Sequence, residues 1–295
     1  MDRRRFISLT PAAVLPLLAI NTRNSFASAD LGTDAAHARL RALEATSGGR
    51  LGVHILDTAT GAQYGNRSDE RFMMLSSFKL AASAFALYRD DQGQDSIQRR
   101  ITYAKKDLVE WSPVTEKHAD GNGMSLAELC EATLVTSDNT AANLILKSFG
   151  GPAGLTGFIR QIGDTVTRFD RYETELNNPH PTEPMDTTTP RAMAETVRSL
   201  VLGNVLSEKS RQLLRAWLVG NQTGGKRLKA GLPENWIIAD KTGTSRRDMA
   251  DIGVIWAGAR SPFVVTAYLA GATGNAAAKE STYKEIGRLI AGLSD

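Results

Sequence analysis

The sequence predicts an α/β fold in which a mostly antiparallel sheet, flanked by helices, is joined to an all-helical part. Strand patterns occur near both ends of the chain, at residues 50–61 and 235–271. Residues 75–219 show helical patterns and almost no strand pattern. Because each sheet face must be covered by other elements, the simplest fold pairs the two terminal segments in one sheet beside a helical block.

Each terminal segment has a recognisable pattern. Helical spacing over residues 34–46 ends at a pair of glycines, and the next stretch alternates apolar residues from Leu51 before breaking at Gly61. Three further strands are expected within residues 235–271, the last two separated by a hairpin-like break at residues 260–262. A final helix is expected over residues 276–293.

The middle of the chain predicts four helices and one long loop. Residues 125–151 contain two helices that meet at Ser137-Asp138-Asn139 and end at Gly150-Gly151. Residues 189–203 and 207–220 predict two more. The loop at residues 168–187 has three prolines and no apolar periodicity. An irregular segment of this length inside a compact chain is usually functional or disordered.

The first 29 residues resemble a cleaved secretory signal. They combine Arg3-Arg4-Arg5, a modest apolar stretch and an Ala27-Ser28-Ala29 end. The arginines followed by Phe6 resemble the twin-arginine variant of this signal. A membrane anchor is the alternative, but the apolar stretch contains two prolines and is shorter than the roughly 20 residues that a span needs. We therefore expect cleavage after Ala29 and a periplasmic protein of a Gram-negative-type bacterium.

Composition excludes several classes of function. Without residues 1–29 the chain carries 31 basic and 31 acidic residues, so nucleic-acid binding is not expected. The single cysteine, Cys130, lies in an apolar helical pattern and reads as a buried thiol. No histidine pair has metal-ligand spacing, so neither a metal site nor a cofactor is expected. The four scattered histidines are His37, His54, His118 and His180.

Ser76 and Lys79 interrupt an apolar run in a way that suggests chemistry. Residues three apart on a helix are neighbours, with about 5–6 Å between their Cβ atoms. A lysine in an apolar environment has a lowered pKa and can take a proton from a nearby hydroxyl. The pair therefore suggests a serine nucleophile with a lysine base. Alone, this four-residue pattern is common and weak evidence.

Two later motifs strengthen that interpretation. Ser137-Asp138-Asn139 lies at a break between helices, where helix capping is the ordinary alternative. Lys241-Thr242-Gly243 follows an apolar strand, where a solvated edge lysine is the alternative. The ordered set S-x-x-K, S-D-N and K-T-G is the one found in class A β-lactamases and penicillin-binding proteins.

The resemblance extends over essentially the whole chain after residue 29. The segments RYETELN (171–177) and MDTTTP (185–190) resemble the Ω-loop of the class A serine β-lactamases, and VEWSPVTEKH (109–118) resembles the loop at their cleft entrance. The sequence is therefore identified as a member of this family, with the fold of serine β-lactamases and transpeptidases. The implied division is an α/β domain from residues 30–68 and 220–295, and a helical domain from residues 69–219.

The resemblance also implies the roles of the site residues. Ser76 would form an acyl-enzyme, with Lys79 or Glu173 as the base for acylation. Glu173 would act again in deacylation, and Ser137 would pass a proton to the lactam nitrogen. The backbone N–H groups of Ser76 and Thr244 would form the oxyanion hole. The residues expected to contact substrate or the hydrolytic water are Trp111, Asn139, Asn177, Arg227, Lys241, Thr242 and Gly243.

Arg227 is expected in the substrate site because this chain departs from the family pattern at position 250. Many members carry an arginine on the strand after K-T-G, where this chain has Ala250. Others supply the guanidinium from the preceding region, which Arg227 matches. A solvated basic turn is the alternative. Arg171 and Asp186 match the family pair that closes the neck of the Ω-loop.

Further departures concern covalent structure. The common family disulfide is absent, because Cys130 faces Ser83 instead of a second cysteine, and Leu75 precedes the nucleophile where class A carbapenemases have a cysteine. Thr174 follows Glu173 where the family often has proline, and the sequence leaves the isomer of that peptide open.

The predicted function is hydrolysis of penicillins and at least some cephalosporins, giving antibiotic resistance, by a monomer with no stable membrane anchor. One alternative is a penicillin-binding DD-peptidase that is acylated and does not turn over. Glu173 argues against it, since such enzymes lack a base for the acyl-enzyme. Another is a binding module with the same fold, which the complete set of polar residues disfavours.

Overall fold

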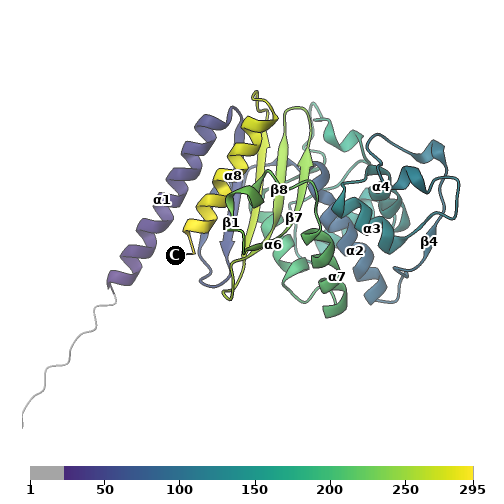
Figure 1. Ribbon diagram of the computed structural model, residues 1–295, viewed down its shortest axis with the longest axis horizontal. Helices are drawn as coiled ribbons and strands as arrows, with labels where there is room; N and C mark the ends of the chain where they lie inside the picture. Colours follow the sequence, from purple (N-terminus) through teal and green to yellow (C-terminus); the bar gives the residue numbers. More distant parts are fainter. Residues whose placement is uncertain (1–22, 295) are drawn as a thin grey trace, which may run out of the picture.

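Strands from both ends of the chain form one antiparallel sheet of five strands, in the order β2-β1-β9-β8-β7 (Figure 1). The computed structural model describes residues 23–294. Within the sheet, Arg50 pairs with Ala270 and Asp57 with Phe263, so the first strand lies along the last one. The strands are β1 (Arg50–Asp57), β2 (Gln63–Asn66), β7 (Ile237–Thr244), β8 (Met249–Trp256) and β9 (Phe263–Ala270).

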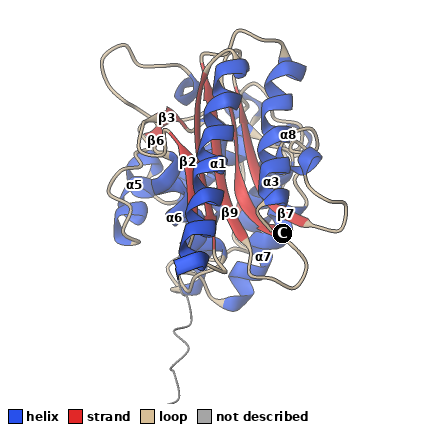
Figure 2. Ribbon diagram, turned by 90° about the vertical axis from the view of Figure 1, so that its left-hand side faces the viewer, coloured by secondary structure: helices blue, strands red, loops and turns tan. Residues whose placement is uncertain are grey.

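Helices cover both faces of this sheet. Helices α1 (Arg23–Ser47) and α8 (Ala276–Gly292) lie against one face (Figures 1 and 2). Val53 and Ile55 of β1 belong to the apolar core on that side. On the other face, Phe72 and Tyr268 stack with ring centroids 6.0 Å apart and join the core of the helical part. The alternation expected from residue 51 onwards is thus confirmed, as is the α/β fold class.

The helical part lies beside the sheet and ends in loops far from α1 (Figure 1). Two short ladders, β3 (Phe72–Met73) with β6 (Thr187–Thr188) and β4 (Arg100–Ile101) with β5 (Met124–Ser125), hold its connecting segments. Its helices are α2 (Lys79–Asp91), α3 (Leu126–Val135), α4 (Asn139–Ser148), α5 (Gly151–Gln161), α6 (Pro190–Val201) and α7 (Glu208–Val219).

Helix α5 was not predicted. Gly150 has the left-handed φ of 92° expected of a glycine after a helix, but the chain enters a new helix at the next residue. Pro152 lies in the first turn of that helix, where its missing N–H costs nothing. The two glycines therefore join two helices and do not begin a loop.

The expected signal lies mostly outside the described residues. Residues 1–22 are not described, and the predicted cleavage point after Ala29 falls within α1. Among residues 23–294, no helix is long and apolar enough to cross a membrane.

His54 is a buried polar group in this fold that the sequence analysis did not single out. It lies on β1 and is 1% exposed, with Nδ1 3.3 Å from Ser68 Oγ and Nε2 without a hydrogen-bond partner among residues 23–294. Burial and, to a smaller extent, the positive charge of Arg191 lower the pKa of His54 to about 4. The folded protein therefore holds this imidazole in its neutral form.

His54 should make stability depend on pH. An unfolded chain protonates histidine below a pKa of about 6.5, whereas the folded protein resists protonation until about pH 4. Stability should fall as the pH drops through this window, with His54 contributing at most about 2 kcal/mol of the loss at about pH 5. Urea unfolding near pH 7.5 and pH 5 should show a smaller loss for His54→Gln than for the parent. Equal losses would contradict this assignment.

Candidate active site

Ser76 lies in a tight turn immediately before a helix. The turn is the 3-10 segment η1 (Leu75–Phe78), and Lys79 is the first residue of α2. The sequence suggested one continuous helix here, and the structure corrects this. Leu75 adopts a φ of 51°, an uncommon conformation for a non-glycine residue. Such conformations persist where the surrounding packing imposes them, often at functional sites.

Strand β7 approaches this turn closely because residue 243 is glycine. A Cβ atom at Gly243 would lie 2.7 Å from Leu75 Cβ and 3.1 Å from both Met74 O and Ser76 N. The K-T-G glycine therefore allows an edge strand to lie directly against the turn that holds Ser76.

Lys79 is fully buried and surrounded by acceptors. Its Nζ lies 2.9 Å from Ser76 Oγ, 2.9 Å from Ser137 O and 2.5 Å from Asn139 Oδ1. Glu173 Oε1 is 3.0 Å from the same Nζ. Burial lowers the pKa of Lys79, and the charge of Glu173 opposes that shift. The predicted lysine and serine are thus in direct contact.

Glu173 reaches Ser76 from the Ω-loop segment, residues 168–187. Its Oε1 accepts a hydrogen bond from Ser76 Oγ at 3.0 Å, and its Oε2 accepts one from Asn177 Nδ2 at 2.6 Å. Asn143 of α4 holds the glutamate backbone, with Nδ2 2.8 Å from Glu173 O and Oδ1 2.9 Å from Glu173 N. The Glu173–Thr174 peptide is cis.

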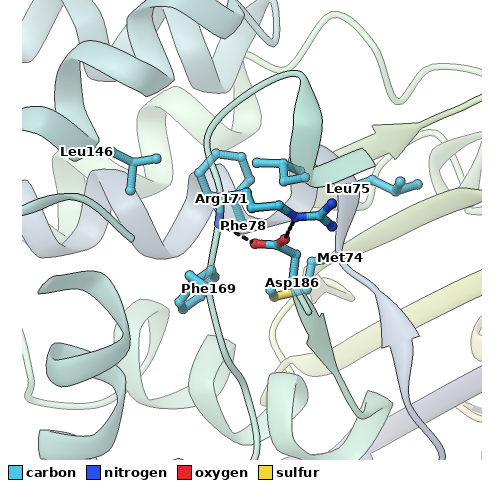
Figure 3. Close-up of a pocket in the computed structure, with 8 residues that line it drawn as sticks. Met74, Leu75, Phe78, Leu146, Phe169, Arg171 and Asp186 are labelled. Atoms are coloured by element: carbon cyan, nitrogen blue, oxygen red, sulfur yellow. Dashed lines mark hydrogen bonds and ion pairs between the residues drawn. The ribbon is translucent and has the colours of Figure 1, made fainter. Parts of the chain in front are cut away.

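An ion pair closes the neck of this segment (Figure 3). Arg171 Nε donates to Asp186 Oδ2 at 2.7 Å, and Asp186 Oδ1 accepts from the backbone N–H groups of Asp170 and Arg171. The side chains are only 14% and 3% exposed, so removing either partner would leave a buried charge uncompensated. The narrow pocket beside it is lined by Met74, Leu75, Phe78, Leu146, Phe169 and Leu176.

Ser137 lies between two buried ammonium groups. It adopts a φ of 62°, and its Oγ is 3.3 Å from Lys79 Nζ and 3.1 Å from Lys241 Nζ. Trp111, 62% exposed, is joined to the same segment, because its Nε1 donates to Thr136 O and its carbonyl accepts from Asn139 N. The S-D-N segment therefore fixes the positions of both the Ser137 hydroxyl and the cleft-entrance loop.

Lys241 is also fully buried, and its Nζ is 2.8 Å from Thr242 O. Burial holds the pKa of Lys241 well below its usual range, and the charge of Lys79 lowers it further. An anionic ligand beside this group would restore its charged form.

Two buried aspartates lie on the neighbouring strands. Burial raises the pKa of Asp240 on β7, and it raises that of Asp251 on β8 well above its usual range.

Arg227 lies behind β7. Its guanidinium donates to Gly243 O at 2.9 Å, to Ala250 O at 2.7 Å and to Thr244 Oγ1 at 2.6 Å. The side chain is 4% exposed, and it is not among the residues that line the cleft. Arg227 can therefore influence a ligand in the cleft through the Thr244 hydroxyl, without contacting the ligand itself.

The site opens into a cleft of about 620 Å³, a volume that suits a small molecule. Lys79, Glu173 and Lys241 do not line the cleft themselves, but they contact Ser76 or Ser137, which do. Unexpected lining residues are Glu110, Thr223, Asn178 and Arg246. Asn143 was also missed, although its position four residues after Asn139 places both on one face of α4. The predicted site residues that line the cleft are Ser76, Trp111, Ser137, Asn139, Asn177, Thr242, Gly243 and Thr244.

Comparisons with known proteins show the family to which the chain belongs. Residues 35–293 match the family described as the β-lactamase enzyme family. The chain is 46% identical to β-lactamase OXY-2 of Klebsiella oxytoca over 260 residues, which covers 87% of each chain. It is 44% identical to β-lactamase L2 of Stenotrophomonas maltophilia over 299 residues, which covers 98% of each.

Solved structures give the same relationship. An ancestral class A β-lactamase superposes with a TM-score of 0.86 at 55% identity, covering 88% of this chain and 99% of its own. The putative class A β-lactamase PenP from Rhodopseudomonas palustris also gives a TM-score of 0.86, at 52% identity, covering 88% and 100%.

Proposed function

The chain belongs to the class A serine β-lactamases, and we propose that Ser76 opens the β-lactam ring as an acyl-enzyme that Glu173 then hydrolyses. The enzyme is a β-lactam hydrolase, and its activity gives antibiotic resistance. The observation that carries the residue assignment is the contact of Ser76 Oγ with two buried partners, Lys79 Nζ at 2.9 Å and Glu173 Oε1 at 3.0 Å.

Acylation begins when Ser76 Oγ attacks the lactam carbonyl carbon. The hydroxyl proton passes to Lys79 or Glu173, both of which are within hydrogen-bond reach. The carbonyl oxygen gains charge between the backbone N–H groups of Ser76 and Thr244. The C–N bond then breaks, and the nitrogen takes a proton from Ser137 Oγ. Lys79 and Lys241 both lie close enough to Ser137 to replace that proton.

Deacylation requires a water molecule on the Ω-loop side. Glu173 takes a proton from this water while its oxygen attacks the ester carbon, and Ser76 recovers its proton as the C–Oγ bond breaks. Asn177 supports this role, because its Nδ2 holds Glu173 and its buried Oδ1 has no partner among the described residues. That oxygen is available to accept a hydrogen bond from the attacking water.

We assign the substrate carboxylate to the end of the cleft opposite the Ω-loop. Lys241, Thr242 and Thr244 supply an ammonium and two hydroxyl groups there, while Asn139 meets the side-chain amide and Trp111 forms a wall. Penicillins and at least some cephalosporins are the proposed substrates. No comparison supports the DD-peptidase alternative, and the Glu173–Asn177 pair explains why the acyl-enzyme should turn over.

Turnover of benzylpenicillin and nitrocefin by purified enzyme tests the proposed function. We expect many molecules of product per enzyme, because a base for each step contacts the reacting hydroxyl. Ser76→Ala should reduce turnover by several orders of magnitude and show no covalent adduct by intact-protein mass spectrometry. Ser77→Ala is the matched control, since Ser77 Oγ donates to Met74 O at 2.7 Å and does not line the cleft. A single equivalent of product would instead favour the DD-peptidase reading, and none would favour a binding module.

Arg227 should act mainly on substrate binding. We propose that it orients Thr244 Oγ1 and adds positive charge behind the carboxylate position. Arg227→Ala should raise the KM for benzylpenicillin about tenfold or more, as expected for loss of a charge-assisted hydrogen bond, with a smaller change in kcat. Steady-state kinetics should show partial rescue in Arg227→Lys. An unchanged KM would remove Arg227 from the site.

We further propose export to the periplasm through a twin-arginine signal in residues 1–29, in a Gram-negative-type bacterium. Cell fractionation after replacing Arg3, Arg4 and Arg5 with lysine should find precursor in the cytoplasm. Undiminished periplasmic activity would refute this route.

The mature enzyme is proposed to be a monomer, which light scattering would check. We propose that it consists of an α/β domain of residues 30–68 and 220–295 and a helical domain of residues 69–219.

A further inference from the structure

A second cavity, of about 450 Å³, lies where the distal half of the Ω-loop meets the end of the sheet. Its volume is within the range of small-molecule sites. Buried Phe72, Met249 and Tyr268 contribute apolar surface, and Pro184 and Met185 of the Ω-loop add more. No residue lines both this cavity and the catalytic cleft.

Three guanidinium groups surround this apolar surface. Arg50 lies 3.9 Å from the centre of the Phe72 ring and is paired with Glu70 at 3.0 Å. Arg71 donates only to Thr187 Oγ1 and Val166 O, and Arg247 donates to Gly271 O. Within residues 23–294, neither Arg71 nor Arg247 has a carboxylate within ion-pair distance, so both guanidinium groups can pair with a ligand.

The acidic residues at the cavity are already engaged. Glu183 is 3.6 Å from Arg168, which also pairs with Asp170. Both oxygens of Asp248 accept hydrogen bonds, from Gly271 N at 2.7 Å and from Ser245 Oγ at 2.9 Å. Three guanidinium groups and two carboxylates line the cavity, so its net charge favours an anion over a cation.

We propose that this cavity binds a small aromatic dicarboxylate. An arginine matches a carboxylate with paired N–H donors, and the two unpaired arginines supply one such partner for each acidic group. Pro184 and Met185, the more exposed apolar residues of the lining, would contact the ring between them. A compact inorganic anion would leave that apolar surface uncovered, which is why the class of ligand is organic.

The two arginines come from segments that also build the catalytic cleft. Arg71 donates to Thr187 at the end of the Ω-loop, and Arg247 follows Ser245 and Arg246, which line the cleft. A ligand that joins them would connect the end of the Ω-loop to the β7–β8 hairpin. The site is nevertheless separate from the carboxylate position at Lys241.

Titration of the enzyme with benzene-1,3-dicarboxylate, followed by amide NMR spectra, tests the proposal without using turnover. We expect saturable shifts at Thr187, Met249 and Gly271, with a dissociation constant of about 1 mM, in keeping with the affinity per atom of small ligands. Benzoate, with one carboxylate, should bind at least about tenfold more weakly. Higher salt should weaken both interactions.

Substitutions then identify the site. Arg71→Gln and Arg247→Gln keep a hydrogen-bond donor but remove the charge, and each should weaken binding about tenfold. Arg39→Gln on α1, at an exposed ion pair with Glu285 of α8, is the matched control and should leave binding unchanged. The dispersion of the spectra reports whether each variant is folded.

Three results would overturn the proposal. Binding that survives both Arg71→Gln and Arg247→Gln would exclude this cavity, as would the absence of any saturable shift. Shifts confined to Ser76, Ser137 and Thr242 would place the dicarboxylate in the catalytic cleft instead.

Discussion

The architecture of the site depends on keeping two ammonium groups, Lys79 and Lys241, out of water. Removing a charge from water costs several kcal/mol unless acceptors replace the lost hydration. The acceptors here come from distant parts of the chain: Ser76 from the turn before α2, Ser137 and Asn139 from the α3–α4 junction, and Glu173 from the Ω-loop. The same burial lowers the pKa of both lysines, which is the property that proton transfer requires.

This constraint accounts for much of the surrounding structure. Glu173 reaches Lys79 only because the Arg171–Asp186 pair closes the loop and Asn143 fixes the glutamate backbone. Lys241 reaches Ser137 only because Gly243 lets an edge strand lie against the nucleophile turn. Antiparallel pairing of both chain ends places that strand at the edge of the sheet beside the helical part. Fold and chemistry are therefore coupled through a few close approaches.

Local patterns in the sequence were sufficient for the fold class, since alternation at Val53 and Ile55 and the helical middle segment require little tertiary information. The S-x-x-K, S-D-N and K-T-G motifs also indicated which serine and lysine residues lie together at the proposed site, because motif resemblance carries tertiary information that periodicity lacks. Other features depended on contacts distant in sequence. The 3-10 turn at Leu75–Phe78 is held against β7, and the position of Arg227 behind Thr244 follows from the pairing of β7 with β8. No local pattern encodes either one.

The central claim is that Glu173 is required more for deacylation than for acylation, because Lys79 can assist only the step that starts at the Ser76 hydroxyl. Intact-protein mass spectrometry of Glu173→Ala after mixing with benzylpenicillin tests this most directly. General-base catalysis contributes typically 10²–10⁴-fold, so the account predicts a burst of about one equivalent and a persistent adduct on Ser76. Glu175→Ala, at an exposed position in the same loop, should turn over like the parent. Parental turnover by Glu173→Ala, with no adduct, would contradict the account.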